Sequence, residues 1–318
     1  MTPRSNPGIP HQAPRPRSGT RIDLSFGPYD ASFASVGATL RKLTFAGRDL
    51  VVPFEADEVR PYYRGAALAP WPNRVVDGHY LDAEGRLQVL AITEPRRGHA
   101  LHGFSPWLDF EVVGSTSTSV QFAASIPAQA GYPHEVAVTV EYWLDADGLH
   151  SLTRARNDDS VAAPIGLSTH PYLVAGPGRV DDWTLSLPAA QILDVDERLA
   201  PTELGALSTP AYTAYDFRTA RQIAELEIDH AYTALERTGE EYVVQVLAAD
   251  GTGVQLAWPE GDWLQIHTGD LPDPDISRLG LAVEPMTCAP NAFNSDLAGV
   301  LVEPGEHRQL SFTISAIA

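Results

Sequence analysis

A chain of 318 residues, 44% of them hydrophobic, is long enough to bury a sizeable core in one large domain or two average ones. Its net charge of −19 repels phosphate backbones and anionic membranes, which argues against nucleic acid or a membrane surface as a partner. The single cysteine, Cys288, excludes an intrachain disulfide and a cysteine-rich zinc site.

The first 20 residues carry Arg and Pro but no apolar segment, so we expect a disordered tail over residues 1–20 and not a secretory signal. No run of 18 apolar residues follows, so no membrane-spanning helix is expected, and a cytoplasmic location follows by default. Because no linker-like break interrupts the rest, residues 21–318 are expected to form a single domain.

Alternation of apolar and polar residues predicts the first clear strand at residues 136–142, where every second side chain is apolar. A turn at residues 145–148 and a return strand over 149–156 complete a hairpin. An apolar, strand-like run over residues 163–168 stops just before a His-Pro pair. Residues 220–226 could form one or two turns of helix.

Further strands are expected toward the C-terminus. They lie at 242–248 and 254–258, joined by an Asp-Gly turn, and then at 263–267, 279–283 and 309–317. Gly and Pro, with 25 and 26 copies, suit many strands joined by turns. The pattern predicts an all-β protein, mostly antiparallel, of the size of a large β-sandwich.

Two ionisable residues follow predicted strands directly. His170 comes after the run 163–168, and Glu284 comes after the run 279–283. An imidazole titrates near pH ~6.5 and a carboxylate near ~4.3, so at neutral pH the first can give a proton and the second can take one. A carboxylate that closes an apolar run also risks burial, and a buried carboxylate needs partners or a function.

Other polar residues stand near turns or strand ends: Arg74, His102 and Asp229. Each also has a structural explanation, as a surface ion-pair partner, a structural histidine or a turn residue. Gln265 and His267 share one face of the strand 263–267 with Trp263, so all three are expected to line one pocket. The carboxylates show no spacing that predicts a metal site.

The order of these residues along the chain resembles the aldose 1-epimerase (galactose mutarotase) family. The segments similar to family motifs are Asn73-Arg74-Val75-Val76, Leu101-His102-Gly103, Thr169-His170-Pro171-Tyr172-Leu173, Tyr215-Asp216-Phe217-Arg218, Asp229-His230, His267-Thr268-Gly269 and Glu284-Pro285. No single motif is specific, but the ordered set is, and it extends from about Phe33 to the C-terminus. The resemblance implies the supersandwich fold of galactose mutarotase.

The chain departs from the family pattern in four places. Phe104 stands where many relatives have a second Gly, Met286-Thr287 replace Gln and an acidic residue, Asn291 stands near a common Asp, and His267 replaces a Tyr. These differences are typical of a divergent bacterial-type branch, and they leave the sugar preference open.

The resemblance implies a mutarotase that interconverts the α and β anomers of a free aldose without a cofactor or metal. In that interpretation Glu284 is the base on the C1 hydroxyl and His170 the acid on the ring oxygen. Arg74, His102 and Asp229 hold sugar hydroxyls, Gln265 and His267 line the pocket, and Trp71, Trp263 or Phe293 could stack on the sugar.

Three alternatives remain at this point. A hexose-6-phosphate 1-epimerase would use the same acid and base, with Arg60, Arg64, Arg96 and Arg97 supplying a local basic pocket for the phosphate. A glycosidase would use Asp229 and Glu284 as its carboxylate pair, which leaves His170 without a role. A non-catalytic carbohydrate-binding protein would have no need for both His170 and Glu284.

Overall fold

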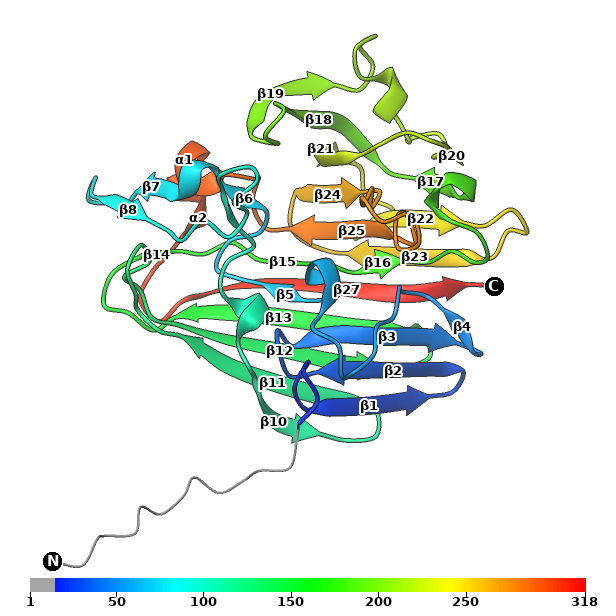
Figure 1. The fold of residues 1–318 in the computed structure, drawn as a ribbon, viewed down its shortest axis with the longest axis horizontal. Coiled ribbons are helices and arrows are strands. Elements are labelled where there is room, and N and C mark those ends of the chain that lie inside the picture. The colour runs from blue at the N-terminus through cyan, green and yellow to red at the C-terminus, as the bar shows by residue number, and fades with distance from the viewer. Residues whose placement is uncertain (1–14) are drawn as a thin grey trace, which may run out of the picture.

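The computed structural model describes residues 15–318 (Figure 1). Of the tail expected over residues 1–20, residues 1–14 lie outside the described part. Residues 15–20 lie against the body of the protein: the hydroxyl of buried Ser18 donates to the carbonyl of Ala56 at 2.6 Å, and Arg15 pairs with Asp109 at 2.6 Å.

The widest sheet is antiparallel and contains nine strands (Figure 1). In spatial order they are β10 (Glu111–Ser115), β11 (Ser119–Ile126), β12 (Val136–Leu144), β13 (Leu149–Asn157), β27 (His307–Ile317), β23 (Gly253–Trp258), β22 (Tyr242–Leu247), β17 (Thr184–Ser186) and β20 (Arg221–Gln222). Strand β27 pairs with β13 on one side and β23 on the other, and it therefore joins the two halves of the sheet.

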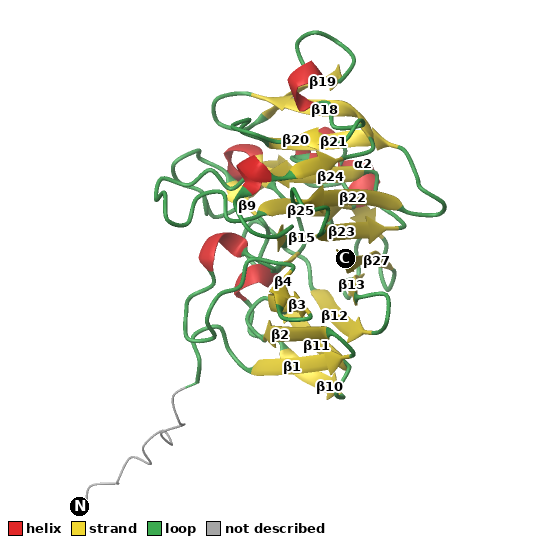
Figure 2. Ribbon diagram, turned by 90° about the vertical axis from the view of Figure 1, so that its right-hand side faces the viewer, coloured by secondary structure: helices red, strands yellow, loops and turns green. Residues whose placement is uncertain are grey.

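A second, eight-stranded sheet carries most of the polar residues predicted to act. Its strands are β19 (Pro201–Ala206), β18 (Ala189–Val195), β21 (Asp229–Leu235), β24 (Trp263–His267), β25 (Leu281–Met286), β15 (Ser168–Thr169) and β5 (Ala67–Leu68), with β16 (Tyr172–Leu173) paired to β25 beside β15. Figures 1 and 2 place this sheet against β22 and β23, at the opposite end of the molecule from β1.

Smaller sheets and short helices complete the fold. The four-stranded sheet is β1 (Arg21–Phe26), β2 (Tyr29–Ala34), β3 (Thr39–Phe45) and β4 (Arg48–Asp49). Three pairs are β6 (Arg74–Val75) with β9 (Ala100–Leu101), β7 (His79–Leu81) with β8 (Leu87–Val89), and β14 (Ala163–Pro164) with β26 (Leu301–Val302). The helices are α1 (Ala292–Ser295), α2 (Leu297–Val300) and the 3₁₀ turns Pro61–Tyr63, Val76–Gly78, Ser105–Trp107, Val180–Asp182 and Thr213–Tyr215. Within residues 15–318, none of these helices has the length and apolar character that crossing a bilayer requires.

The antiparallel all-β prediction is confirmed, because the strands of both large sheets pair antiparallel. The larger apolar core cluster runs from Leu24 in β1 to Ile314 in β27. Strands β12 and β13 confirm the predicted hairpin, and they bury alternate residues as the sequence pattern requires. The division into a single domain stays a prediction.

Two expectations about local structure are wrong. Residues 220–226 form no helix: β20 occupies Arg221–Gln222, and Ala224 has φ +53°, which a right-handed helix does not contain. Glu284 does not close a strand but lies inside β25, which continues to Met286 because Met286 pairs with Ser168.

Gly103 shows how backbone conformation holds the loop beside His102. Its φ is +68°, and an added β-carbon would overlap the carbonyl oxygen of Ala69. We expect Gly103→Ala to lower the free energy of unfolding by roughly 3 kcal/mol, from the left-handed backbone and the overlap together. Urea unfolding measures this loss.

Gly27→Ala is the matched control, because Gly27 has φ +55° and an added β-carbon would meet nothing within 4 Å. It should lose only the cost of the positive φ, about 1–2 kcal/mol. Equal losses in the two variants would contradict the steric argument.

Candidate active site

Strand register brings Glu284 together with three other predicted residues. Glu284 lies opposite Gln265 across β24 and β25, and His267 lies opposite Asp229 across β21 and β24. Paired residues in an antiparallel sheet project to the same face, and so do alternate residues of one strand. All four side chains therefore share one face of the eight-stranded sheet, and Gln265 Nε2 donates to Asp229 Oδ1 at 2.7 Å.

His170 reaches the same face from a break in the pairing. Ser168 pairs with Met286 and Tyr172 with Ala282, so the same register places His170 opposite Glu284. His170 Nε2 lies 3.5 Å from Glu284 Oε1. The predicted imidazole and carboxylate are therefore neighbours, although 114 residues (284 minus 170) separate them in the chain.

Arg74 and His102 come from the small β6–β9 pair, where Arg74 lies opposite Leu101. The next residues outward, Asn73 and His102, both have positive φ, +51° and +61°, a conformation that Asn and His tolerate better than most side chains. The backbone N–H of Asn73 donates to His102 Nδ1 at 3.2 Å. This bond orients the His102 ring so that Nε2 remains for another partner.

These residues surround one cavity of about 430 Å³, a size suited to a small ligand. All seven predicted site residues line it: Arg74, His102, His170, Asp229, Gln265, His267 and Glu284. The remaining lining residues are Tyr62, Tyr63, Asn73, Glu94, Arg96, Arg97, Leu101, Tyr172, Asp270, Leu271 and Pro272. The structure thus gathers the predicted set, while their chemical roles stay predictions.

Burial dominates the electrostatics of the central pair. Burial lowers the pKa of His170 to about 3, and the nearby cationic side chains of Arg60 and Arg64 act in the same direction. Burial also raises the pKa of Glu284 well above its usual value; the negative charge of Asp229 adds to this, and Arg74 partly opposes it. Both shifts favour uncharged side chains, so the pair holds one proton between two atoms 3.5 Å apart.

Arg74 is the buried cation of the cavity. Its Nε donates to Glu94 Oε2 at 2.8 Å, and its Nη2 lies 3.8 Å from Asp229 Oδ2. Burial lowers the pKa of the guanidinium, but the Glu94 hydrogen bond and the charge of Asp229 outweigh burial and raise it. Burial lowers the pKa of His102 well below its usual value, and the positive charge of Arg74 acts in the same direction. His102 is therefore a neutral hydrogen-bonding group beside a permanent cation.

The aromatic residues expected to stack on a sugar lie elsewhere. Trp71 and Phe293 are buried in the core, with their ring centroids 5.7 Å apart. Trp263 was expected to share a pocket with Gln265 and His267, but it does not line the cavity. The rings that line the cavity are those of Tyr62, Tyr63 and Tyr172.

Tyr172 also supports His170, because their rings stack at 5.1 Å with 16° between the planes. The guanidinium of Arg64 covers the Tyr172 ring at 5.7 Å. Arg60 and Arg64, expected near a phosphate, are buried and donate to backbone carbonyls of Val36, Pro106 and Pro53. Neither lines the cavity, so that part of the basic-pocket expectation is wrong.

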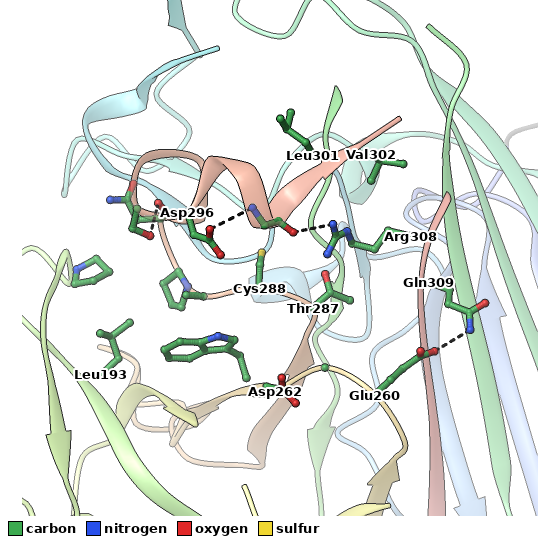
Figure 3. A pocket seen from close by; sticks show the side chains of 18 of the residues that line it. Leu193, Glu260, Asp262, Thr287, Cys288, Asp296, Leu301, Val302, Arg308 and Gln309 are labelled. Carbon is green, nitrogen blue, oxygen red and sulfur yellow. Dashed lines mark hydrogen bonds between the residues drawn. The ribbon is translucent and has the colours of Figure 1, made fainter. Parts of the chain in front are cut away.

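A larger hollow of about 940 Å³ lies at the end of β25 and beside α2 (Figure 3). Trp263 lines it together with Thr287 and Cys288, which directly follow β25. Two of its carboxylates are engaged: Glu260 accepts from Gln309 at 2.9 Å, and Asp262 accepts from Tyr242 at 2.9 Å. Because His170 and Glu284 do not line this hollow, the smaller cavity is the candidate active site.

Across residues 15–318, no group of three or more His, Cys, Asp or Glu side chains is placed to hold a metal ion. The expectation that no cofactor is needed stays a prediction.

Comparison with known proteins agrees with this fold. The sequence profile of the aldose 1-epimerase family matches residues 21–315. The chain belongs to the aldose 1-epimerase family. This confirms the resemblance read from the ordered motifs, and it includes every residue of the cavity.

Two family relatives and one solved structure show how far the likeness extends. The uncharacterized Escherichia coli protein YihR is 36% identical over 301 residues, which cover 93% of each chain. Mouse galactose mutarotase is 26% identical over 271 residues, 78% of this chain and 76% of the mouse protein. The crystal structure of a Caenorhabditis elegans GalM/aldose epimerase homologue superposes with a TM-score of 0.81 at 22% identity, over 94% of this chain and 99% of the other. The aldose 1-epimerase fold is therefore shared along almost the whole chain.

Proposed function

We propose that this member of the aldose 1-epimerase family is an active mutarotase, which interconverts the α and β anomers of a free aldose. The observation that carries the proposal is the buried His170–Glu284 pair, 3.5 Å apart on the wall of a sugar-sized cavity. One proton must leave the C1 hydroxyl while another reaches the ring oxygen, and an adjacent acid and base can do both.

Ring opening begins with the pair in its ionised form. Ionised Glu284 takes the proton of the C1 hydroxyl, the C1–O5 bond breaks, and protonated His170 delivers its proton to O5. The products are the open-chain aldehyde, neutral His170 and neutral Glu284. Rotation about C1–C2 presents the other face of the aldehyde, and reversal of both proton transfers closes the ring as the second anomer.

The burial of the pair supports this mechanism. Uncharged His170 and uncharged Glu284 are the forms that burial favours, and they are also the forms that accompany the open-chain aldehyde. Burial therefore favours the protonation state that accompanies the open-chain aldehyde, and the ionised pair that starts ring opening forms from the uncharged pair by transfer of the shared proton. The positive charge of Arg74 opposes the rise in the pKa of Glu284, which keeps the ionised base accessible.

The remaining lining residues would hold the sugar ring while C1 turns. Arg74 and Asp229 offer a charged donor and a charged acceptor, which make the stronger hydrogen bonds to neutral hydroxyls, roughly 1.5–3 kcal/mol each. His102, Gln265 and His267 add neutral groups around them. Fixing the ring favours the reactive geometry at C1.

Polarimetry tests the proposal directly. Fresh α-D-glucose, α-D-galactose, L-arabinose and D-xylose change rotation slowly in buffer, and we expect the protein to accelerate at least one of them. Sugar binding without acceleration would instead support the non-catalytic carbohydrate-binding alternative. Release of reducing sugar from an aryl glycoside would support the glycosidase, although Gln265 and Arg74 already surround the carboxylate of Asp229.

A second candidate, hexose-6-phosphate 1-epimerase, keeps one specific observation in its favour. Exposed Arg96 lines the cavity, and within residues 15–318 no carboxylate lies at ion-pair distance from it. Its neighbour Arg97 also lines the cavity but is paired with Glu94 at 2.7 Å. A faster turnover of glucose 6-phosphate than of glucose would favour this substrate.

A further inference from the structure

Glu94 lines the cavity, yet neither the motifs nor the acid–base mechanism uses it. It lies in the turn between β8 and β9, where its carbonyl accepts from the backbone N–H groups of Arg97 at 3.1 Å and Gly98 at 2.9 Å. Its side chain is only 12% exposed. A carboxylate so little exposed needs strong partners or a function.

The partners of the Glu94 carboxylate are two arginines of the cavity. Arg74 donates to it twice, from Nε at 2.8 Å and from Nη2 at 3.2 Å, and Arg97 donates from Nη1 at 2.7 Å. Burial alone would raise the pKa of Glu94, but these bonds and charges outweigh burial and lower it. Glu94 is therefore a carboxylate that holds Arg74 in a two-pronged contact, which fixes the plane of the guanidinium.

The turn that carries Glu94 is itself anchored to the sheet. Arg198, in the connection between β18 and β19, donates from Nε to the carbonyl of Arg97 at 3.0 Å. The His99 ring lies 3.0 Å from the carbonyl oxygen of Arg198. These contacts hold the turn to the eight-stranded sheet, so Glu94 acts on Arg74 from a fixed position.

The hydrogen bonds of Arg74 define what remains for a ligand. A guanidinium has five N–H donors. Glu94 takes two, and the side-chain oxygen of Asn73 takes a third from Nη1 at 3.3 Å. One N–H on Nη1 and one on Nη2 remain, next to the carboxylate of Asp229, 3.8 Å away. This set of two donors beside an acceptor matches neighbouring hydroxyl groups.

We propose that Glu94 is a positioning residue for substrate recognition, which orients the Arg74 guanidinium so that its two remaining N–H groups meet the hydroxyls of the sugar. The assignment rests on the proposed function, because it takes the ligand to be an aldose. Glu94 touches the substrate's partner and not the reacting atoms, so its effect belongs to binding and not to proton transfer.

The test compares Glu94→Gln, Arg74→Lys, the double variant and Asp158→Asn. The last is the matched control: it removes a carboxylate paired with Arg156 at 2.5 Å, in a pair that lines none of the pockets named above. Calorimetry with D-galactose and D-glucose at anomeric equilibrium gives Kd, polarimetry gives KM and kcat, and the side-chain ¹⁵N–¹H spectrum reports the Nε–H of Arg74. Arg74→Lys identifies that signal by its loss.

We expect Glu94→Gln to raise Kd and KM roughly 10-fold with little change in kcat. A roughly 10-fold change corresponds to the loss of one well-aligned charged hydrogen bond. The double variant should bind no more weakly than Arg74→Lys alone, because Glu94 acts through Arg74. The Arg74 Nε–H signal should shift in Glu94→Gln and stay in place in Asp158→Asn.

An unchanged Kd in Glu94→Gln, losses that multiply in the double variant, or an unmoved Arg74 signal would each overturn this role. Failure of the proposed function has a different signature: no acceleration of mutarotation by the unsubstituted protein. In that case calorimetry still decides the role of Glu94 in sugar binding. If no sugar binds at all, the role of Glu94 in sugar recognition is overturned, whatever the Arg74 signal does.

Discussion

Glu284→Gln should reduce the catalysed rate of mutarotation by roughly 10²–10⁴, the contribution of one well-placed base. Glutamine has nearly the same shape and is uncharged, as burial already makes Glu284. It cannot accept the C1 proton, so the ionised form of the His170–Glu284 pair no longer exists. Sugar binding should change little, because Arg74 and Asp229 remain. Polarimetry measures the rate, and calorimetry measures the binding.

Glu260→Gln is the matched control for this change. Glu260 lines the larger hollow of Figure 3 and accepts a hydrogen bond from Gln309, so the same exchange is made away from the cavity. We expect its rate to equal that of the unsubstituted protein. A polarimetric rate that survives Glu284→Gln would remove Glu284 from the role of base.

His170→Asn should cause the second large loss, again roughly 10²–10⁴ in kcat, because asparagine cannot deliver a proton to the ring oxygen. The pH profile adds a second expectation. Because the pKa of His170 is lowered to about 3, the pair does not take up a second proton near pH 6.5. The rate of the unsubstituted protein should therefore not fall as the pH drops from 7 to 5.

In His170→Asn the residual rate should depend on ionised Glu284 alone. This residual rate should rise as the pH passes through the raised pKa of Glu284. In the unsubstituted protein, by contrast, the proton is shared by His170 and Glu284. Stopped polarimetric assays between pH 5 and pH 8 measure both profiles. A loss of only a few-fold would show that another group supplies the proton to the ring oxygen.

Local pattern was enough to predict much of the fold. The β12–β13 hairpin was visible in the sequence because alternate residues of a half-buried strand must be apolar. Two neighbours of β25 were not visible, since its pairing with β15 and β16 joins segments more than 100 residues apart. Such register depends on side-chain packing between distant segments, which no local period records.

Part of the candidate site could likewise be predicted from the sequence, and part could not. The ordered motifs predicted His170 and Glu284, and the structure places them side by side. Glu94 was missed because its partner Arg74 lies 20 residues earlier, and only the β6–β9 pairing brings its turn to the cavity. One signal was present: Glu94 stands directly before a proline and two arginines, between the Arg74 and His102 motifs.

The place of β27 in the wide sheet has a consequence for synthesis on the ribosome. Strands β13 and β23 do not pair with each other: β13 pairs with β12, β23 pairs with β22, and only β27 lies between β13 and β23 to join them. The two halves can form hairpins as they emerge, but the sheet between them closes only after residues 307–317 have been translated. In a nascent chain the edge of β13 therefore stays open from residue 157 until β27 is made, and the edge of β23 joins it only after residue 258. These open edges are where we expect chaperones to bind and misfolding to begin.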